Sequence, residues 1–180
     1  MSPDQRFRYT LECVGRDSDA CVQFLYAWVA FQYAAARNKA AVRKINENAL
    51  YWNTVLGGLQ TSLFIALGRL FDADKKSHGL DKLLRIATTE QNVFSRSALA
   101  RRKSQGSPGS NWINSYVASA HVPTTKDFAR LRRYVASRRK IYVKNYAPIR
   151  NKVFAHSALG SLQKVDALFS KTNLGELQRL

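Results

Sequence analysis

The stretch 124–146, TTKDFARLRRYVASRRKIYVKNY, decides the fold class because its apolar and charged residues recur with a helical period. At about 100° per residue, its large apolar side chains fall within about 60° of one another. They are Phe128, Leu131, Val135, Tyr142 and Tyr146. The cations Arg130, Arg133, Lys140 and Lys144 fall within about 80° on the opposite face. The stretch therefore predicts an amphipathic helix that packs on a core and exposes a cationic face.

Both ends of this helix carry local signals. Thr124 and Asp127 have the spacing of a capping box, with Asp where Glu or Gln is usual, so the helix should begin there. Pro148 has no amide hydrogen and clashes with the preceding turn, so it predicts a kink or break near Tyr146 and Ala147.

The rest of the chain is also predicted to be helical. Apolar spacing predicts a long helix over residues 17–48, capped by Asp17 or Ser18, and a second over residues 49–71. Residues 48–68 contain no charged side chain, but their polar interruptions favour a buried bundle helix over a membrane span. Shorter helices are expected over residues 80–88 and 93–103, then an irregular segment over residues 104–110.

Two further short helices are expected in the second half of the chain. Trp112 and Tyr116 suggest a short helix that docks on the core, and Asn173 with Glu176 begins a helix just before the chain stops. That end either frays or belongs to a shortened product. No alternating strand pattern and no repeat occurs, so the chain is expected to be one all-α domain over residues 1–180.

The charge of the chain is strongly positive and unevenly distributed. It has 29 Lys and Arg against 12 Asp and Glu, and residues 85–152 alone hold 15 basic and 2 acidic residues. Such a basic region attracts polyanions, so RNA or another phosphate backbone is the favoured partner. An anionic membrane and a merely solvated face are the weaker alternatives, and no membrane partner is predicted.

Several chemistries lack their residues. Cys13 and Cys21 have no nearby histidine, and the N-terminus has no signal-peptide pattern, so a reducing, cytoplasmic location is expected. There is no His-x-x-x-His, no phosphate-binding glycine loop and no carboxylate cluster. The sequence therefore predicts neither a metal nor a cofactor. His78 and His121 are both expected to be exposed.

One segment joins a guanidinium to an imidazole. Residues 149–156, IRNKVFAH, follow the basic helix and place Arg150, then Asn151, six and five positions before His156. An imidazole titrates near neutral pH, and a guanidinium matches phosphate oxygens. On a regular helix, Arg150 and His156 would lie about 9 Å and about 120° apart and would not converge within one chain. Either His156 lies beyond the helix end, or a second subunit completes the site.

This segment resembles the Arg-x(4–6)-His motif of the HEPN superfamily. The upstream run over residues 62–72, SLFIALGRLFD, is similar to the abortive-infection branch of that superfamily and contains Arg69 and Asp72. The resemblance implies a HEPN-like up-and-down bundle of four or five helices, with a short helical insertion before the motif helix. It also implies that Arg69 and Asp72 support the site.

The same resemblance implies a metal-independent endoribonuclease that works as a homodimer in toxin–antitoxin or phage-defence systems. His156 would act as general acid or base at the ribose 2′-hydroxyl, leaving a 2′,3′-cyclic phosphate. Arg150 would hold the phosphate, and Asn151 would orient either Arg150 or His156. Relatives paired with an antitoxin often carry a Tyr two positions after the His, whereas this chain has Ala158.

The residues expected to contact RNA outside the motif are cations of the basic region, namely Arg130, Arg133, Lys140, Lys144 and Lys152. A non-catalytic RNA-binding module, in which Arg150 only contacts phosphate, is the main alternative to the nuclease. A helical adaptor for acidic proteins is the third class.

Overall fold

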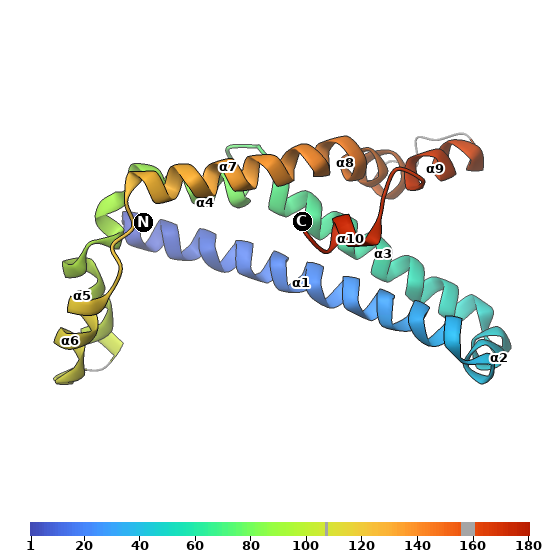
Figure 1. The fold of residues 1–180 in the computed structure, drawn as a ribbon, viewed down its shortest axis with the longest axis horizontal. Coiled ribbons are helices and arrows are strands. Elements are labelled where there is room, and N and C mark those ends of the chain that lie inside the picture. The colour runs from blue at the N-terminus through green and yellow to red at the C-terminus, as the bar shows by residue number, and fades with distance from the viewer. Residues whose placement is uncertain (107, 156–160) are drawn as a thin grey trace.

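The computed structural model describes residues 1–106, 108–155 and 161–180, and helices dominate these ranges (Figure 1). The α-helices are α1 (Pro3–Arg37), α2 (Lys39–Glu47), α3 (Ala49–Phe71), α4 (Leu80–Thr89), α5 (Arg96–Gly106), α6 (Trp112–Ser119), α7 (Thr125–Ile141), α8 (Ala147–Ile149), α9 (Leu162–Phe169) and α10 (Leu174–Leu177). Shorter 3-10 or π segments are η1 (Gln91–Phe94), η2 (Tyr142–Tyr146) and η3 (Arg150–Ala155). No strand occurs in the described ranges, and the all-α prediction is confirmed.

Asparagine side chains set the turns between the first three helices. The Asn38 side chain accepts hydrogen bonds from the first amides of α2, and the Asn48 side chain accepts one from the Tyr51 amide of α3. Because such caps satisfy amides that have no partner within the helix, a single residue suffices to end one helix and begin the next. As a result, α3 returns alongside α1, as Figure 1 shows.

The first helix begins much earlier than its apolar pattern predicts. Ser2 and Gln5 form a capping box, and Pro3 occupies the first turn. Thr10 and Val14 are buried on this N-terminal part, although its sequence is largely polar. The prediction that Asp17 or Ser18 caps the helix is therefore wrong, since Asp17 lies inside α1.

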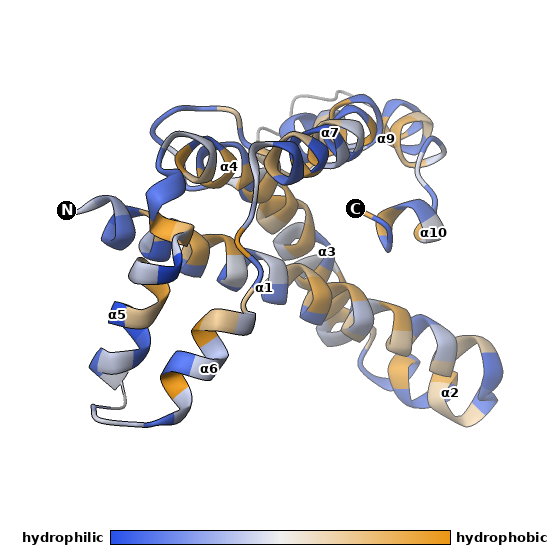
Figure 2. Cartoon of the chain, turned by 60° about the vertical axis from the view of Figure 1, so that its left-hand side comes forward, coloured by the Kyte–Doolittle hydropathy of each residue, from blue (hydrophilic) through white to orange (hydrophobic). Residues whose placement is uncertain are grey.

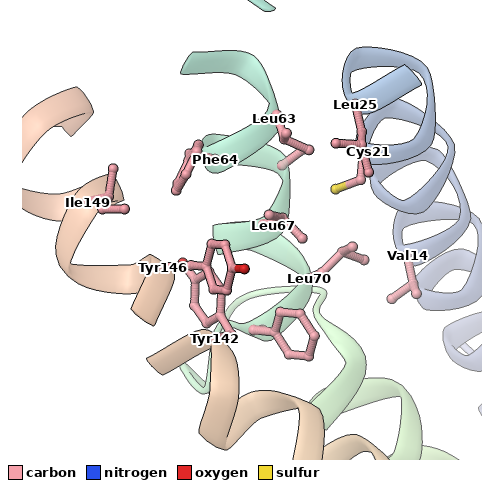
Figure 3. Close-up of a cluster of buried hydrophobic side chains, with 12 residues drawn as sticks. Val14, Cys21, Leu25, Leu63, Phe64, Leu67, Leu70, Tyr142, Tyr146 and Ile149 are labelled. Atoms are coloured by element: carbon pink, nitrogen blue, oxygen red, sulfur yellow. The ribbon is translucent and has the colours of Figure 1, made fainter. Parts of the chain in front are cut away.

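The core lies where α1, α3 and the last long helical run meet (Figure 3). Leu63 and Leu67 of α3 face Leu25 and Cys21 of α1 on one side, and Phe64 points to the other. Their other side is covered by the run over residues 125–155, hereafter the motif helix. Its contributions are Tyr142, Tyr146 and Ile149, all buried. The Phe71 and Tyr142 rings stack with centroids 5.1 Å apart.

The two halves of α3 differ sharply in burial. Leu63, Phe64, Leu67, Leu70 and Phe71 are buried in the core, whereas Leu50 is 81% exposed and Tyr51 is also exposed. By length and composition this helix could cross a membrane, with 39% of its most apolar window buried. The prediction of a buried bundle helix therefore describes only its C-terminal half. Its N-terminal half and α2 extend away from the core as an arm (Figure 1).

The insertion before the motif helix is the hairpin of α5 and α6, which projects from one end of the molecule (Figure 2). Ile113 is buried between these two helices, while Trp112 and Tyr116 are exposed. The prediction that this short helix docks on the core is wrong, because α6 packs on α5 instead. Residues 104–106 are helical rather than irregular, and residue 107 lies outside the described part.

The C-terminal end returns to the core. Asn173 caps α10 through the Glu176 amide, as its sequence predicts, and the Tyr146 hydroxyl donates to the Asn173 carbonyl at 3.1 Å. Leu177 and Leu180 pack against the core cluster. This short helix is held by burial rather than by its own length.

Candidate functional site

The motif helix stays helical past Pro148. At Tyr142–Tyr146 the hydrogen-bond pattern widens to the π form, and the Ala147 amide bonds to the Tyr142 carbonyl. A wider turn removes the need for an i to i−4 hydrogen bond from the proline nitrogen. The predicted break is thus replaced by a π turn, and the motif helix continues to Ala155.

Arg150 lies on the side of the motif helix that faces α3. Ile149 before it is fully buried, and Phe154 packs on Phe64 with ring centroids 5.1 Å apart. The side chain of Arg150 runs directly over Gly68. A Cβ built on Gly68 would lie 2.3 Å from Arg150 Nε and 2.6 Å from Cδ, so only glycine leaves room for this side chain as placed.

The Arg150 guanidinium has neutral partners. Its Nη1 donates to Asn151 Oδ1 at 3.0 Å, and its Nε is buried without a hydrogen-bond partner. No carboxylate of the described residues is within ion-pair distance of it. The fork is therefore fixed by packing and by one amide, and its charge is available to an anion.

The positive charge of Arg150 acts on the pKa of the Tyr142 hydroxyl. Burial raises the pKa of this hydroxyl, the positive charge of Arg150 opposes that rise, and the negative charge of Asp72 adds to it. Arg150 and Asp72 thus both act on the same buried phenol. The predicted supporting residue Asp72 lies on this side of α3, where its side chain also accepts a hydrogen bond from the Asp74 amide at 2.9 Å.

Arg69 is directed elsewhere. Its Nε and Nη2 both lie 2.7 Å from Asp17 Oδ1, so the side chain ties α3 to α1 rather than approaching Arg150. The structure therefore separates the two predicted supporting residues. Their role in a reaction stays a prediction.

His156 and Ala158 lie outside the described residues, so the meeting of Arg150 with His156 stays a prediction. The segment before His156 does carry information. Because Arg150–Ala155 is π-helical, the angle derived for a regular α-helix does not apply to this segment.

The cations of the motif helix fall into two groups. Arg130, Arg133, Lys140, Lys144 and Lys152, the residues predicted to bind RNA, are all exposed. By contrast, Arg139 is partly buried and pairs with Asp81 at 3.2 Å, which ties the motif helix to α4. Arg138 lies 4.9 Å from the centre of the Tyr134 ring. The exposed group forms the cationic face of the motif helix.

The sequence did not predict a second cluster of polar and charged side chains. Cys13, Arg16, Asp17, Arg69 and His78 line a hollow of about 270 Å³ between α1 and the loop before α4. His78 is half-buried rather than exposed as predicted. Its Nδ1 lies 3.1 Å from the hydroxyl of the buried Thr10, and burial followed by the charge of Lys82 lowers its pKa. No sequence signal links residues so far apart in the chain. His121 is exposed, as predicted.

Metal-ligand geometry is not apparent in the described part of the chain. There, no group of three or more His, Cys, Asp or Glu side chains is arranged to hold an ion. Cys13 and Cys21 are free thiols, and burial raises the pKa of Cys21 to about 12. These groups leave Arg150 and its surroundings as the strongest candidate site.

The all-α fold and the Arg150–Asn151 pair on a long basic helix agree with the expected HEPN-like domain. The model of the AbiU2 family of HEPN domains matches residues 17–180, which span most of the helices described above. The chain therefore belongs to the AbiU2 family, an abortive-infection group of the HEPN superfamily. No curated protein and no solved structure shows significant similarity to it.

Proposed function

We propose that this chain is a metal-independent endoribonuclease that acts as a toxin or phage-defence effector. The observation that carries the proposal is the Arg150 guanidinium, which is positioned by Gly68 and Asn151 but has no counter-charge among the described carboxylates. A partly buried cation without an acidic partner is suited to an anionic ligand, and a phosphodiester fits its planar fork.

The proposed reaction is attack by the ribose 2′-hydroxyl on the adjacent phosphorus. His156 removes the proton of that hydroxyl or gives a proton to the departing 5′-oxygen, because its side chain titrates near neutral pH. Arg150 stabilises the negative charge that develops on the phosphate oxygens. Asn151 holds the Arg150 fork through the hydrogen bond described above. The products are a 2′,3′-cyclic phosphate and a 5′-hydroxyl.

A homodimer is part of the proposal. A twofold axis places the same motif from both chains at one interface, which would supply a second arginine and histidine to the site. The cationic face cannot easily meet its own copy, because like charges repel. The uncharged stretch 48–68 can form this interface instead, because its N-terminal half is exposed. The stretch ends at Gly68, which lies directly against Arg150.

A cytoplasmic location and a neutralising antitoxin protein belong to the same proposal. An enzyme that cuts RNA with no added metal or cofactor would damage the RNA of its own cell unless a partner restrained it. Ala158 replaces the tyrosine through which relatives of the antitoxin-paired type are modified, so restraint by that particular modification is not expected.

The test is cleavage of total cellular RNA by the purified protein in excess EDTA. Wild type should cut it, whereas Arg150→Ala and His156→Ala should lose at least about 100-fold in rate, the usual cost of removing a group that stabilises the transition state. Arg43→Ala, at an exposed position on α2, is the matched control and should cut normally. The fragments should carry 2′,3′-cyclic phosphate ends.

The second candidate is a non-catalytic RNA-binding module, favoured by the exposed cations of the motif helix. It predicts salt-sensitive RNA binding and intact RNA after incubation with a folded, dimeric wild type. In that case Arg150→Ala would weaken binding without changing the RNA. Absence of RNA binding even at low salt would favour an adaptor for acidic proteins.

A further inference from the structure

A hollow lies at the start of the motif helix, far along it from Arg150. It has a volume of about 500 Å³ and is formed by the linker after α6 and the first turns of α7. The residues that line it are His121, Pro123, Asp127, Phe128, Arg130, Leu131 and Tyr134. This size is within the range of small-ligand pockets.

The floor and wall of the hollow are apolar and aromatic. Phe128 is 6% exposed and packs on Phe94 at 5.2 Å between ring centroids, so the floor is fixed. Leu131 and Tyr134 are 47% and 54% exposed, although Leu131 belongs to the amphipathic pattern that predicts burial. An aromatic side chain left open beside a hollow offers a flat surface on which a planar ring can stack.

Cations surround this apolar surface. Arg130 belongs to the lining, and Arg138 lies against the Tyr134 ring without lining the hollow. Asp127 is the acidic residue of the lining. Its Oδ2 accepts from the Thr124 amide and hydroxyl, each at 2.8 Å, and lies 3.5 Å from His121, so its charge is engaged in capping α7. After Asp127 the sequence has no carboxylate before Asp166.

From this combination we infer that the hollow binds an unpaired RNA base, with Tyr134 as the stacking surface and Arg130 on the adjacent phosphate. Aromatic stacking beside a cation is how proteins hold single-stranded RNA, and it needs bases that are not paired. The inference deepens the proposed function, because it identifies the substrate as single-stranded RNA bound along the motif helix.

The position of the hollow gives a length rule. Tyr134 precedes Arg150 by 16 positions, which is about 24 Å along a helix. A stacked strand covers that distance with about seven nucleotides, at about 3.4 Å each. Shorter RNA cannot span the distance between Tyr134 and Arg150. When such RNA is bound at Arg150, it should therefore make no contact with the hollow.

The experiment measures oligouridylate affinity by fluorescence anisotropy in an Arg150→Ala background, where the proposed cleavage cannot interfere. For an oligomer of about 20 nucleotides, Tyr134→Ala should weaken binding about tenfold, and Tyr134→Phe should not, because the ring is retained. The residue is more than half exposed, so truncation should leave the thermal transition unchanged.

The chain supplies a matched control. Tyr33 and Arg37 on α1 form the same pair, four positions apart on a helix, with the guanidinium 4.0 Å from the ring centre and with Tyr33 56% exposed. Tyr33 lines none of the hollows described above. Tyr33→Ala should therefore change affinity less than about twofold, since it removes an equal ring without a concave site.

Three results would overturn the inference. They are an equal loss for Tyr33→Ala, an equal loss on blunt duplex RNA, and no loss for Tyr134→Ala on the long oligomer. Failure of the proposed nuclease would look different, since wild type would leave RNA intact while the Tyr134 effect on binding persisted. In a His156→Ala background, which keeps the Arg150 side chain but should not cleave, an oligomer of about four nucleotides should bind with equal affinity with and without Tyr134→Ala.

Discussion

Replacing Gly68 by alanine should disable Arg150 without unfolding the protein. The new Cβ would lie 2.3 Å from Arg150 Nε, whereas non-bonded heavy atoms rest about 3.5–4.0 Å apart. The guanidinium must therefore move by roughly 1.2–1.7 Å. A displacement of about 1 Å in a catalytic group can cost about 100-fold in rate, so RNA cleavage by Gly68→Ala should fall by about that factor.

The stability of Gly68→Ala should change little. Alanine in a helix interior gains about 0.5–1 kcal/mol over glycine, and moderate overpacking costs about 1–3 kcal/mol. Because the clashing atoms belong to a long flexible side chain, the cost should be near the lower limit. The free energy of unfolding in urea should then remain within about 2 kcal/mol of wild type.

Gly15→Ala in α1, outside the stretch proposed to form the dimer, is the matched control. Nothing lies within 4 Å of a Cβ at that position, so this variant should cut RNA normally and gain about 0.5–1 kcal/mol. Combining Gly68→Ala with Arg150→Ala should lower the rate of RNA cleavage no further than Arg150→Ala alone, because both substitutions act on one side chain. A folded Gly68→Ala that cuts RNA within threefold of an active wild type would refute the reasoning.

Further outcomes follow from the hydrogen bonds and charges of the motif helix. Tyr146→Phe removes the hydrogen bond to the Asn173 carbonyl and should cost about 1–2 kcal/mol in urea unfolding. Burial raises the pKa of Tyr146 to about 12, so its contribution to stability is complete below pH 10 and is lost between there and about pH 12. Thr124→Ala should cost about 1 kcal/mol by removing the cap of α7. Hydrogen bonds from Thr124 lower the pKa of Asp127, so wild type should lose stability as the pH falls through that lowered value, and Asp127→Asn should flatten this part of the pH profile. Lys144→Ala should reduce the slope of log affinity for RNA against log salt by about one.

The sequence predicted the elements whose ends carry local signals. The bounds of α3 followed from the apolar spacing over residues 49–71, and the capping box of α7 followed from Thr124 and Asp127, because both signals are local. The start of α1 was missed because its first turns are polar, and their partners, such as Phe94 for Phe7 and Arg102 for Asp4, lie far away in the sequence. The turn at Pro148 was missed because a π turn relieves a local clash in a way that residue preferences do not show.

The site was predictable only in part for a related reason. Arg150 and Asn151 follow from spacing and resemblance, which need no knowledge of packing. Gly68 becomes visible only when α3 is placed against the motif helix, since its importance is the space it leaves for Arg150. The exposed Leu131 contradicts the amphipathic pattern, because the linker after α6 leaves a hollow beside it rather than covering it.

The pairing of arginines separates structural cations from those that can bind RNA. Arg69, Arg102 and Arg139 each reach a carboxylate of another helix and so join α3 to α1, α5 to α1 and the motif helix to α4. Their charges are largely cancelled, and removing one partner would leave the other uncompensated. Arg150 is also held between helices, but by Gly68 and a neutral amide. Because packing rather than a counter-charge fixes it, the guanidinium is held in place before any phosphate binds, and the favourable pairing is left for the ligand to make.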